Sequence, residues 1–109
     1  MLVLEKEKGI FQIKLEKADS FFKRFFGLMG RKALGEGRGM LLSPCGSIHT
    51  FFMKFTIDVL YLDERNMVLY KETIKPWRVG AIVKGTKKVV ELRENAAEAI
   101  EKGDILEFR

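Results

Sequence analysis

The sequence predicts an α+β domain: a small, sheet-rich, mostly antiparallel and partly closed barrel that carries two short helices. Three observations lead to this expectation. Short segments with β character follow one another, and their connections are too short for parallel crossovers throughout. Apolar residues take helical spacing in two places. A chain of 109 residues is long enough for one hydrophobic core, so we expect a single domain over residues 1–109.

The N-terminal part is expected to form a hairpin followed by a helix. The β-like runs Leu2–Glu5 and Ile10–Leu15 are separated by a polar connection that ends in Gly9, as in a β-hairpin. In the second run we expect the odd-numbered residues to face the core. Over Asp19–Met29 the aromatic and aliphatic residues fall on one side of a helical wheel, which predicts an amphipathic helix.

The middle of the chain is expected to contain a glycine-rich loop and three strands. The loop, Gly30–Gly39, contains neither of the glycine patterns that bind phosphate. Short strands are predicted at Gly39–Leu42 and Ile57–Leu62. The turn-forming residues Asp63–Asn66 then reverse the chain, so Met67–Ile74 should return as an antiparallel strand.

The C-terminal part is expected to add three short strands and the second helix. Strands are predicted at Ala81–Lys84 and Lys88–Leu92. A relative of the capping box begins at Asn95, and Gly103 stands where a helix would end in a left-handed residue. The last strand is predicted at Ile105–Phe108.

Composition and charge restrict the class of protein. Apolar residues make up 47% of the chain and charged residues 32%, which is typical of an ordered globular protein. The net charge of +5 raises anionic ligands, nucleic acid and membrane surfaces as partners. Most basic residues alternate with Glu, and no aromatic-and-basic pattern lies on a predicted sheet face, so nucleic acid is not favoured.

The same composition predicts a cytoplasmic protein. No leader-like stretch is present, and no window approaches the roughly 20 apolar residues of a transmembrane segment. The single cysteine excludes an internal disulfide, and the abundance of Lys and Glu is typical of thermophilic proteins.

Cys45 and His49 are the only cysteine and histidine of the chain. In an extended strand a spacing of four residues separates them by roughly 13 Å, so a thiol and imidazole pair is not favoured. A structural zinc site needs four N or S ligands, which this chain does not supply from these residue types. No metal and no cofactor are therefore expected.

The segment Thr50–Asp58 is expected to be a strand with one polar face. Alternation places Thr50, Lys54, Thr56 and Asp58 on that face, together with one phenyl ring. Asp58 adjoins a fully apolar run, so its carboxylate needs a partner. Two interpretations stay open: a buried network in which Asp58 accepts backbone amides, or the floor of a pocket for a polar ligand.

Four separated motifs resemble the domain of unknown function 192 family of small bacterial and archaeal proteins. They are "RFFGLM" (Arg24–Met29), "GMLL" (Gly39–Leu42), "CGSIHTFFMKFTIDVLYLD" (Cys45–Asp63) and "KPWR" followed by "VVEL". The resemblance extends from about Phe11 to the C-terminal end and implies a compact, sheet-rich α+β domain without an established activity. Many relatives carry a Trp and an Asn where this chain has Phe52 and Phe55.

The leading hypothesis is a small soluble binding module with a pocket for a small polar or anionic ligand. Trp77 and Arg78 would lie at its rim, where they could supply a stacking surface and an anion contact. The residues assigned to the site are Arg24, His49, Thr50, Lys54, Thr56, Asp58, Trp77, Arg78 and Glu91.

Two alternatives remain open. One is a hydrolase-type enzyme that uses Asp58 or Glu91 as acid or base with His49. The other is a protein-interaction module in which the basic, Phe-rich helix and the glycine-rich loop contact a partner.

Overall fold

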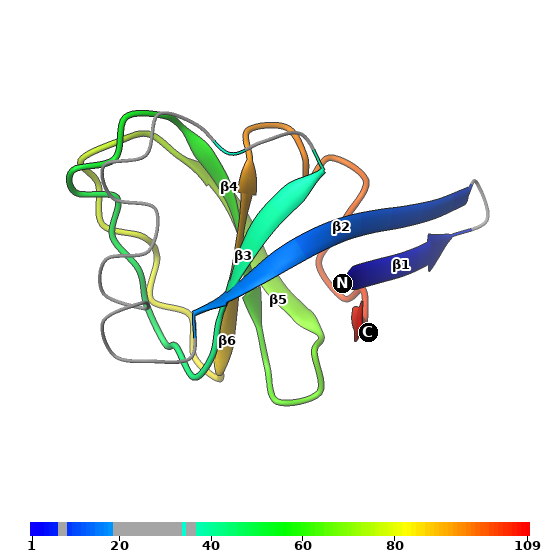
Figure 1. Ribbon diagram of the computed structural model, residues 1–109. Coiled ribbons are helices and arrows are strands. Elements are labelled where there is room, and N and C mark those ends of the chain that lie inside the picture. Colours follow the sequence, from blue (N-terminus) through cyan, green and yellow to red (C-terminus); the bar gives the residue numbers. More distant parts are fainter. Residues whose placement is uncertain (7–8, 19–33, 35–36) are drawn as a thin grey trace.

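A single curled sheet dominates the computed structural model, which describes residues 1–6, 9–18, 34 and 37–109 (Figure 1). Within this part the sheet has seven strands in the order β5-β4-β6-β3-β2-β1-β7. The pair β2 and β3 is parallel, and the other neighbours are antiparallel. The strands are β1 (Leu2–Lys6), β2 (Gly9–Ala18), β3 (Arg38–Leu42), β4 (Ile57–Leu62), β5 (Val68–Ile74), β6 (Lys88–Arg93) and β7 (Glu107–Phe108).

The α+β expectation is wrong for the described residues, because they contain no helix. Where the second helix was predicted, residues 94–99 form successive turns that begin with Asn95 in the left-handed region at a φ of 72°. The amides of Ala96, Glu98 and Ile100 donate to carbonyls three residues earlier, as in turns, and the amide of Ala97 donates to the carboxylate of Asp58. The helix predicted over Asp19–Met29 lies outside the described residues.

The predicted hairpin and most predicted strands are confirmed. β1 and β2 pair in antiparallel register from Leu2 with Ile13 to Lys6 with Gly9. Ile13 is buried and Leu15 packs against the core, whereas Gln12 is exposed. By contrast, the strand predicted at residues 81–84 is part of an irregular loop.

The curled sheet buries side chains on both of its faces. Leu60, Leu62 and Leu92 belong to one apolar cluster, which segment 96–106 covers. Val59 and Tyr61 belong to a second cluster on the other face. All six residues of β4 are therefore buried, which explains the almost continuous apolar run in its sequence.

The C-terminal segment brings the two ends of the sheet together. The amide of Gly103 donates to the carbonyl of Val68 at 2.8 Å, and the amide of Leu106 donates to the carbonyl of Asn66 at 2.9 Å. The next residues form β7, which pairs with β1. The expected partly closed barrel is thus confirmed as a curled half-barrel (Figure 1). Among the described residues, none forms a helix with the length and hydropathy needed to span a bilayer.

Candidate functional site

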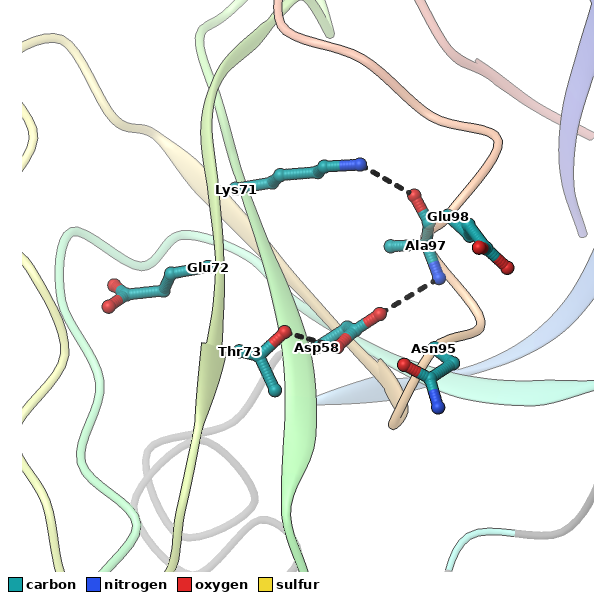
Figure 2. A pocket seen from close by; sticks show the side chains of 7 residues that line it. All are labelled: Asp58, Lys71, Glu72, Thr73, Asn95, Ala97 and Glu98. Carbon is teal, nitrogen blue, oxygen red and sulfur yellow. Dashed lines mark hydrogen bonds between the residues drawn. The ribbon is translucent and has the colours of Figure 1, made fainter.

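A pocket of about 360 Å³ lies where β4 and β5 meet the turns at residues 95–98 (Figure 2). Asp58 projects from β4, and Lys71 and Thr73 project from β5 on the same face of the sheet. Glu72 also contributes to the lining, but Figure 2 shows its carboxylate pointing away from Asp58. The remaining lining residues are Asn95, Ala97 and Glu98.

The polar groups of this pocket hold the turns against the sheet. The hydroxyl of Thr73 donates to Asp58 Oδ1 at 2.8 Å, and the amide of Ala97 donates to Oδ2 at 3.1 Å. Lys71 Nζ donates to the carbonyls of Ile100 at 2.7 Å and of Ala97 at 3.1 Å. The interpretation in which Asp58 accepts a backbone amide is confirmed, with the hydroxyl of Thr73 as its second partner.

The charge of the pocket does not match an anionic ligand. Its lining contains three carboxylates, those of Asp58, Glu72 and Glu98, and one ammonium group, that of Lys71, which already donates to two carbonyls. Like charges repel, so an added carboxylate or phosphate would be disfavoured here. The pocket is therefore not a suitable site for an anionic ligand.

Thr50 joins two loops at one end of the sheet, residues 49–56 and 75–87, which we call the paired loops. Thr50 is fully buried, and its hydroxyl donates to the carbonyl of Lys75 at 2.7 Å and accepts the amide of Arg78 at 2.8 Å. The amide of Trp77 donates to the carbonyl of Thr50 at 2.9 Å. One buried residue therefore fixes how the two loops lie against each other.

The expected extended strand over residues 50–58 is wrong, because β4 begins only at Ile57. Phe51 and Phe52 form a turn, closed by the amide of Met53 donating to the carbonyl of Thr50 at 3.2 Å. The turn breaks the alternation on which the polar face depended. Lys54 is exposed, whereas Thr50 is turned inward.

Four rings gather on the paired loops, and we call them the aromatic surface: His49, Phe51, Phe52 and Trp77. Ring centroids are 5.0 Å apart between His49 and Phe51, 6.1 Å between Phe51 and Trp77, and 4.6 Å between Phe52 and Trp77. Phe52 and Trp77 are 58% and 54% exposed. An apolar surface of this kind is typical of an interaction site.

Phe52 and Trp77 both adopt left-handed backbone conformations, with φ values of 64° and 63°. For bulky side chains this region costs about 1–3 kcal/mol per residue, and such residues concentrate at functional sites. Here the two strained residues touch each other and expose their rings, so the strain places apolar area in solvent and does not bury it. This combination marks the aromatic surface as the candidate functional site.

Four of the predicted site residues meet at this surface: His49, Thr50, Trp77 and Arg78. His49 forms an isolated bridge with Val79, and its Nδ1 accepts the amide of Phe51 at 3.2 Å. A neutral His49 ring therefore carries its proton on Nε2. Arg78 is exposed, and its Nη1 donates to the carbonyl of Trp77 at 3.3 Å.

The other predicted site residues follow this surface along the chain, lie elsewhere on the sheet, or lie outside the described part. Lys54 and Thr56 follow the aromatic turn on the way into β4. Asp58 pairs with Leu92 and Val59 with Glu91 in the antiparallel register, so Asp58 and Glu91 project from opposite faces of the sheet. At most one of the two carboxylates can therefore face His49. Arg24 lies outside the described residues.

Glu91 is a buried carboxyl in the middle of the sheet. It is 4% exposed, and its register neighbours are Met40 on β3 and Val59 on β4. Burial raises the pKa of Glu91 from 4.5 to about 7, since desolvation disfavours the charged form. The pKa of Glu91 therefore lies near neutral pH. Its side chain lies on the face of the sheet that carries the second apolar cluster.

Phe51 and Phe52 are the site residues that the sequence did not reveal. In an extended strand the alternation would place Phe51 and Phe52 on opposite faces. Neither position carries a typical turn-forming residue, so the local sequence offered no signal for this turn.

Sequence comparison shows which family this chain belongs to. The sequence profile of the domain of unknown function 192 family, described as "Uncharacterized ACR", matches residues 3–108. The chain belongs to this family. The UPF0127 protein of Pyrococcus furiosus is 36% identical over 99% of this chain and 97% of its own length. The UPF0127 protein of Pyrococcus abyssi is 34% identical over 83% and 80%, respectively.

A solved structure shares the architecture of this family 192 domain. It is the crystal structure of a protein of unknown function from Novosphingobium aromaticivorans. The two structures match with a TM-score of 0.87 over 98% of this chain and 83% of the other, at 21% sequence identity. This likeness establishes a common fold.

Proposed function

We propose that the protein is a binding module, and that it holds a small anionic ligand with a flat apolar face against the aromatic surface. The observation that carries the proposal is the exposed contact between Phe52 and Trp77, two strained residues whose ring centroids are 4.6 Å apart. Strained, exposed rings are costly in a purely structural loop. A bound ligand would cover their apolar area and offset that cost.

The charge beside the rings supports an anionic ligand. The guanidinium of Arg78 follows Trp77 directly, is exposed, and has a planar donor array that suits carboxylate and phosphate groups. Lys75 and Lys54 are exposed on the same two loops. Stacking on an aromatic ring together with an arginine contact is a frequent way of holding a flat anionic molecule.

Trp77 is the only tryptophan of the chain, so its fluorescence reports directly on this site. Nucleoside monophosphates, sugar phosphates and aromatic carboxylates should be titrated into the protein while Trp77 emission is recorded. We expect at least one class to give a saturable change. Arg78→Gln should weaken that binding by about tenfold or more, the usual effect of losing a charge-assisted hydrogen bond.

Arg93→Gln is the matched control, because Arg93 is an exposed arginine at the end of β6. This variant should bind as the unaltered protein does. The proposal fails if no compound of the three classes changes Trp77 emission, or if Arg93→Gln weakens binding as much as Arg78→Gln.

A further inference from the structure

The paired loops carry the net charge of the whole protein. They contain five basic residues and no Asp or Glu, and the other 15 Lys and Arg residues are matched by the 15 Asp and Glu residues of the chain. All five basic side chains are exposed: Lys54, Lys75, Arg78, Lys84 and Lys87. The carboxylate of Glu72 reaches these loops, where it accepts the amide of Ala81 at 2.9 Å. The two loops thus carry an excess of five positive charges, with the carboxylate of Glu72 beside them.

The same loops carry most of the exposed apolar side chains. Five of the eight large hydrophobic residues that are exposed in the described part belong to them: Phe51, Phe52, Trp77, Val79 and Ile82. Ile82 is 87% exposed and Val79 is 67% exposed, the two highest values among these eight. A surface that combines protruding apolar side chains with basic residues has the composition of a membrane-interface segment.

The two loops present these side chains together. His49 bridges Val79, and the amide of Gly80 donates to the carbonyl of Ile48 at 2.9 Å. Figure 1 shows the loops side by side at one end of the sheet, away from both termini. The two loops therefore lie close enough together to contribute to one surface.

We propose that the paired loops dock on an anionic phospholipid surface, with Ile82, Val79 and the aromatic rings entering the headgroup region and the basic side chains contacting lipid phosphates. This inference goes beyond the proposed function, because it uses the whole surface of the paired loops and takes lipid phosphates as the anions. Lipid is favoured over single-stranded nucleic acid because Val79 and Ile82 offer no flat ring to a base, whereas an acyl chain region buries aliphatic side chains favourably. Tryptophan is one of the residues enriched at membrane–water interfaces.

The test uses vesicles of phosphatidylcholine alone and vesicles that contain equal amounts of phosphatidylcholine and phosphatidylglycerol. The protein should sediment with the anionic vesicles, Trp77 emission should shift to shorter wavelength, and added salt should reverse both effects. Lys84→Gln should weaken vesicle binding by about fivefold, the contribution of one basic residue near an anionic surface. Ile82→Ser should weaken it by about tenfold, through loss of buried apolar area.

Two control variants separate docking from general changes in charge and hydrophobicity. Lys102→Gln removes an exposed lysine outside the paired loops, and Ile105→Ser removes an isoleucine that is 60% exposed outside them. Both should bind vesicles as the unaltered protein does. If they weaken binding as much as Lys84→Gln and Ile82→Ser, the surface is not the one proposed.

Three further outcomes would overturn the inference. These are absence of binding to anionic vesicles, equal binding to phosphatidylcholine alone, and tighter binding to a single-stranded oligothymidylate than to the anionic vesicles. A response of Trp77 to free phosphate compounds without vesicle binding overturns this inference and leaves the proposed function standing. Vesicle binding without a response to any free compound supports docking and contradicts a site for a small ligand.

Discussion

Replacing the buried carboxyl of Glu91 by an amide should change how the stability of the protein depends on pH. Burial raises the pKa of Glu91 from 4.5 in a solvated chain to about 7 in the folded protein. The folded state therefore binds this proton more tightly than the unfolded chain does. Its contribution to stability is fully present below about pH 4.5 and is lost as the pH rises through about 7.

The magnitude follows from the separation of the two pKa values. Each pH unit between 4.5 and about 7 corresponds to about 1.4 kcal/mol, so ionisation of Glu91 costs about 3 kcal/mol of unfolding free energy at alkaline pH. A domain of this size is stabilised by only about 5–15 kcal/mol. The effect is therefore large enough to measure. The register neighbours of Glu91, Met40 and Val59, are uncharged.

The measurement is urea unfolding of the unaltered protein and of Glu91→Gln from about pH 4 to about pH 9. Glutamine has nearly the same shape and no charge, so the variant should gain about 3 kcal/mol relative to the unaltered protein between the two ends of this range. Glu94→Gln, at an exposed residue just after β6, should show no such change. A difference between the unaltered protein and Glu91→Gln that stays constant with pH would refute the reasoning.

Three other substitutions test the contacts that position the paired loops and the pocket. Thr50→Val removes the hydroxyl that joins the loops and should cost about 1–3 kcal/mol in urea unfolding, with a changed Trp77 emission in the folded protein; unchanged emission would contradict this role. In Gly80→Ala the new Cβ would lie 2.5 Å from Tyr61 Oη, so melting should occur at lower temperature, whereas Gly46→Ala, which meets nothing within 4 Å, should melt normally. Asp58→Ala leaves the buried amide of Ala97 without its carboxylate acceptor and should speed hydrogen exchange over residues 95–100; protection equal to that of the unaltered protein would show that Asp58 does not hold the turns.

Strands were predictable where burial on a sheet face decides the conformation. Ile57–Leu62 was predicted within its observed bounds because both faces of β4 are buried and the sequence is almost continuously apolar. The hairpin of β1 and β2 was predictable from alternation, as the burial of Ile13 and the exposure of Gln12 show. In these elements each residue lies on one of the two faces of the sheet. The burial of those faces therefore determines the pattern of apolar and polar residues along the strand.

The turn at Phe51 and Phe52 could not be predicted from local pattern, because a distant contact decides it. The hydroxyl of Thr50 binds the backbone of Lys75 and Arg78, which lie 25 and 28 residues further along the chain. The β propensity of the neighbouring residues favoured an extended segment, and this tertiary contact overrides it.

The helix predicted from Asn95 is likewise replaced by turns, which contact another strand. The residues after Asn95 have helix-forming character, yet Asn95 is left-handed and the amides of Glu98 and Ile100 donate to carbonyls three residues earlier, as in turns. The amide of Ala97 donates to Asp58 on β4. The carboxylate of Asp58 also accepts the hydroxyl of Thr73, its register partner on β5. A prediction made from one segment cannot include an acceptor supplied by another strand.

The pocket and the paired loops differ in how their polar groups are used. Asp58 and Lys71 point toward the turns at residues 95–100 and use their hydrogen bonds to hold them, so the pocket between them has little capacity left for a ligand. The paired loops differ, because Thr50 satisfies their backbone from inside and the side chains of Phe52 and Trp77 are left outside. Such an arrangement fixes the loop backbone without using the outward-facing rings, which is the condition for a preorganised binding surface.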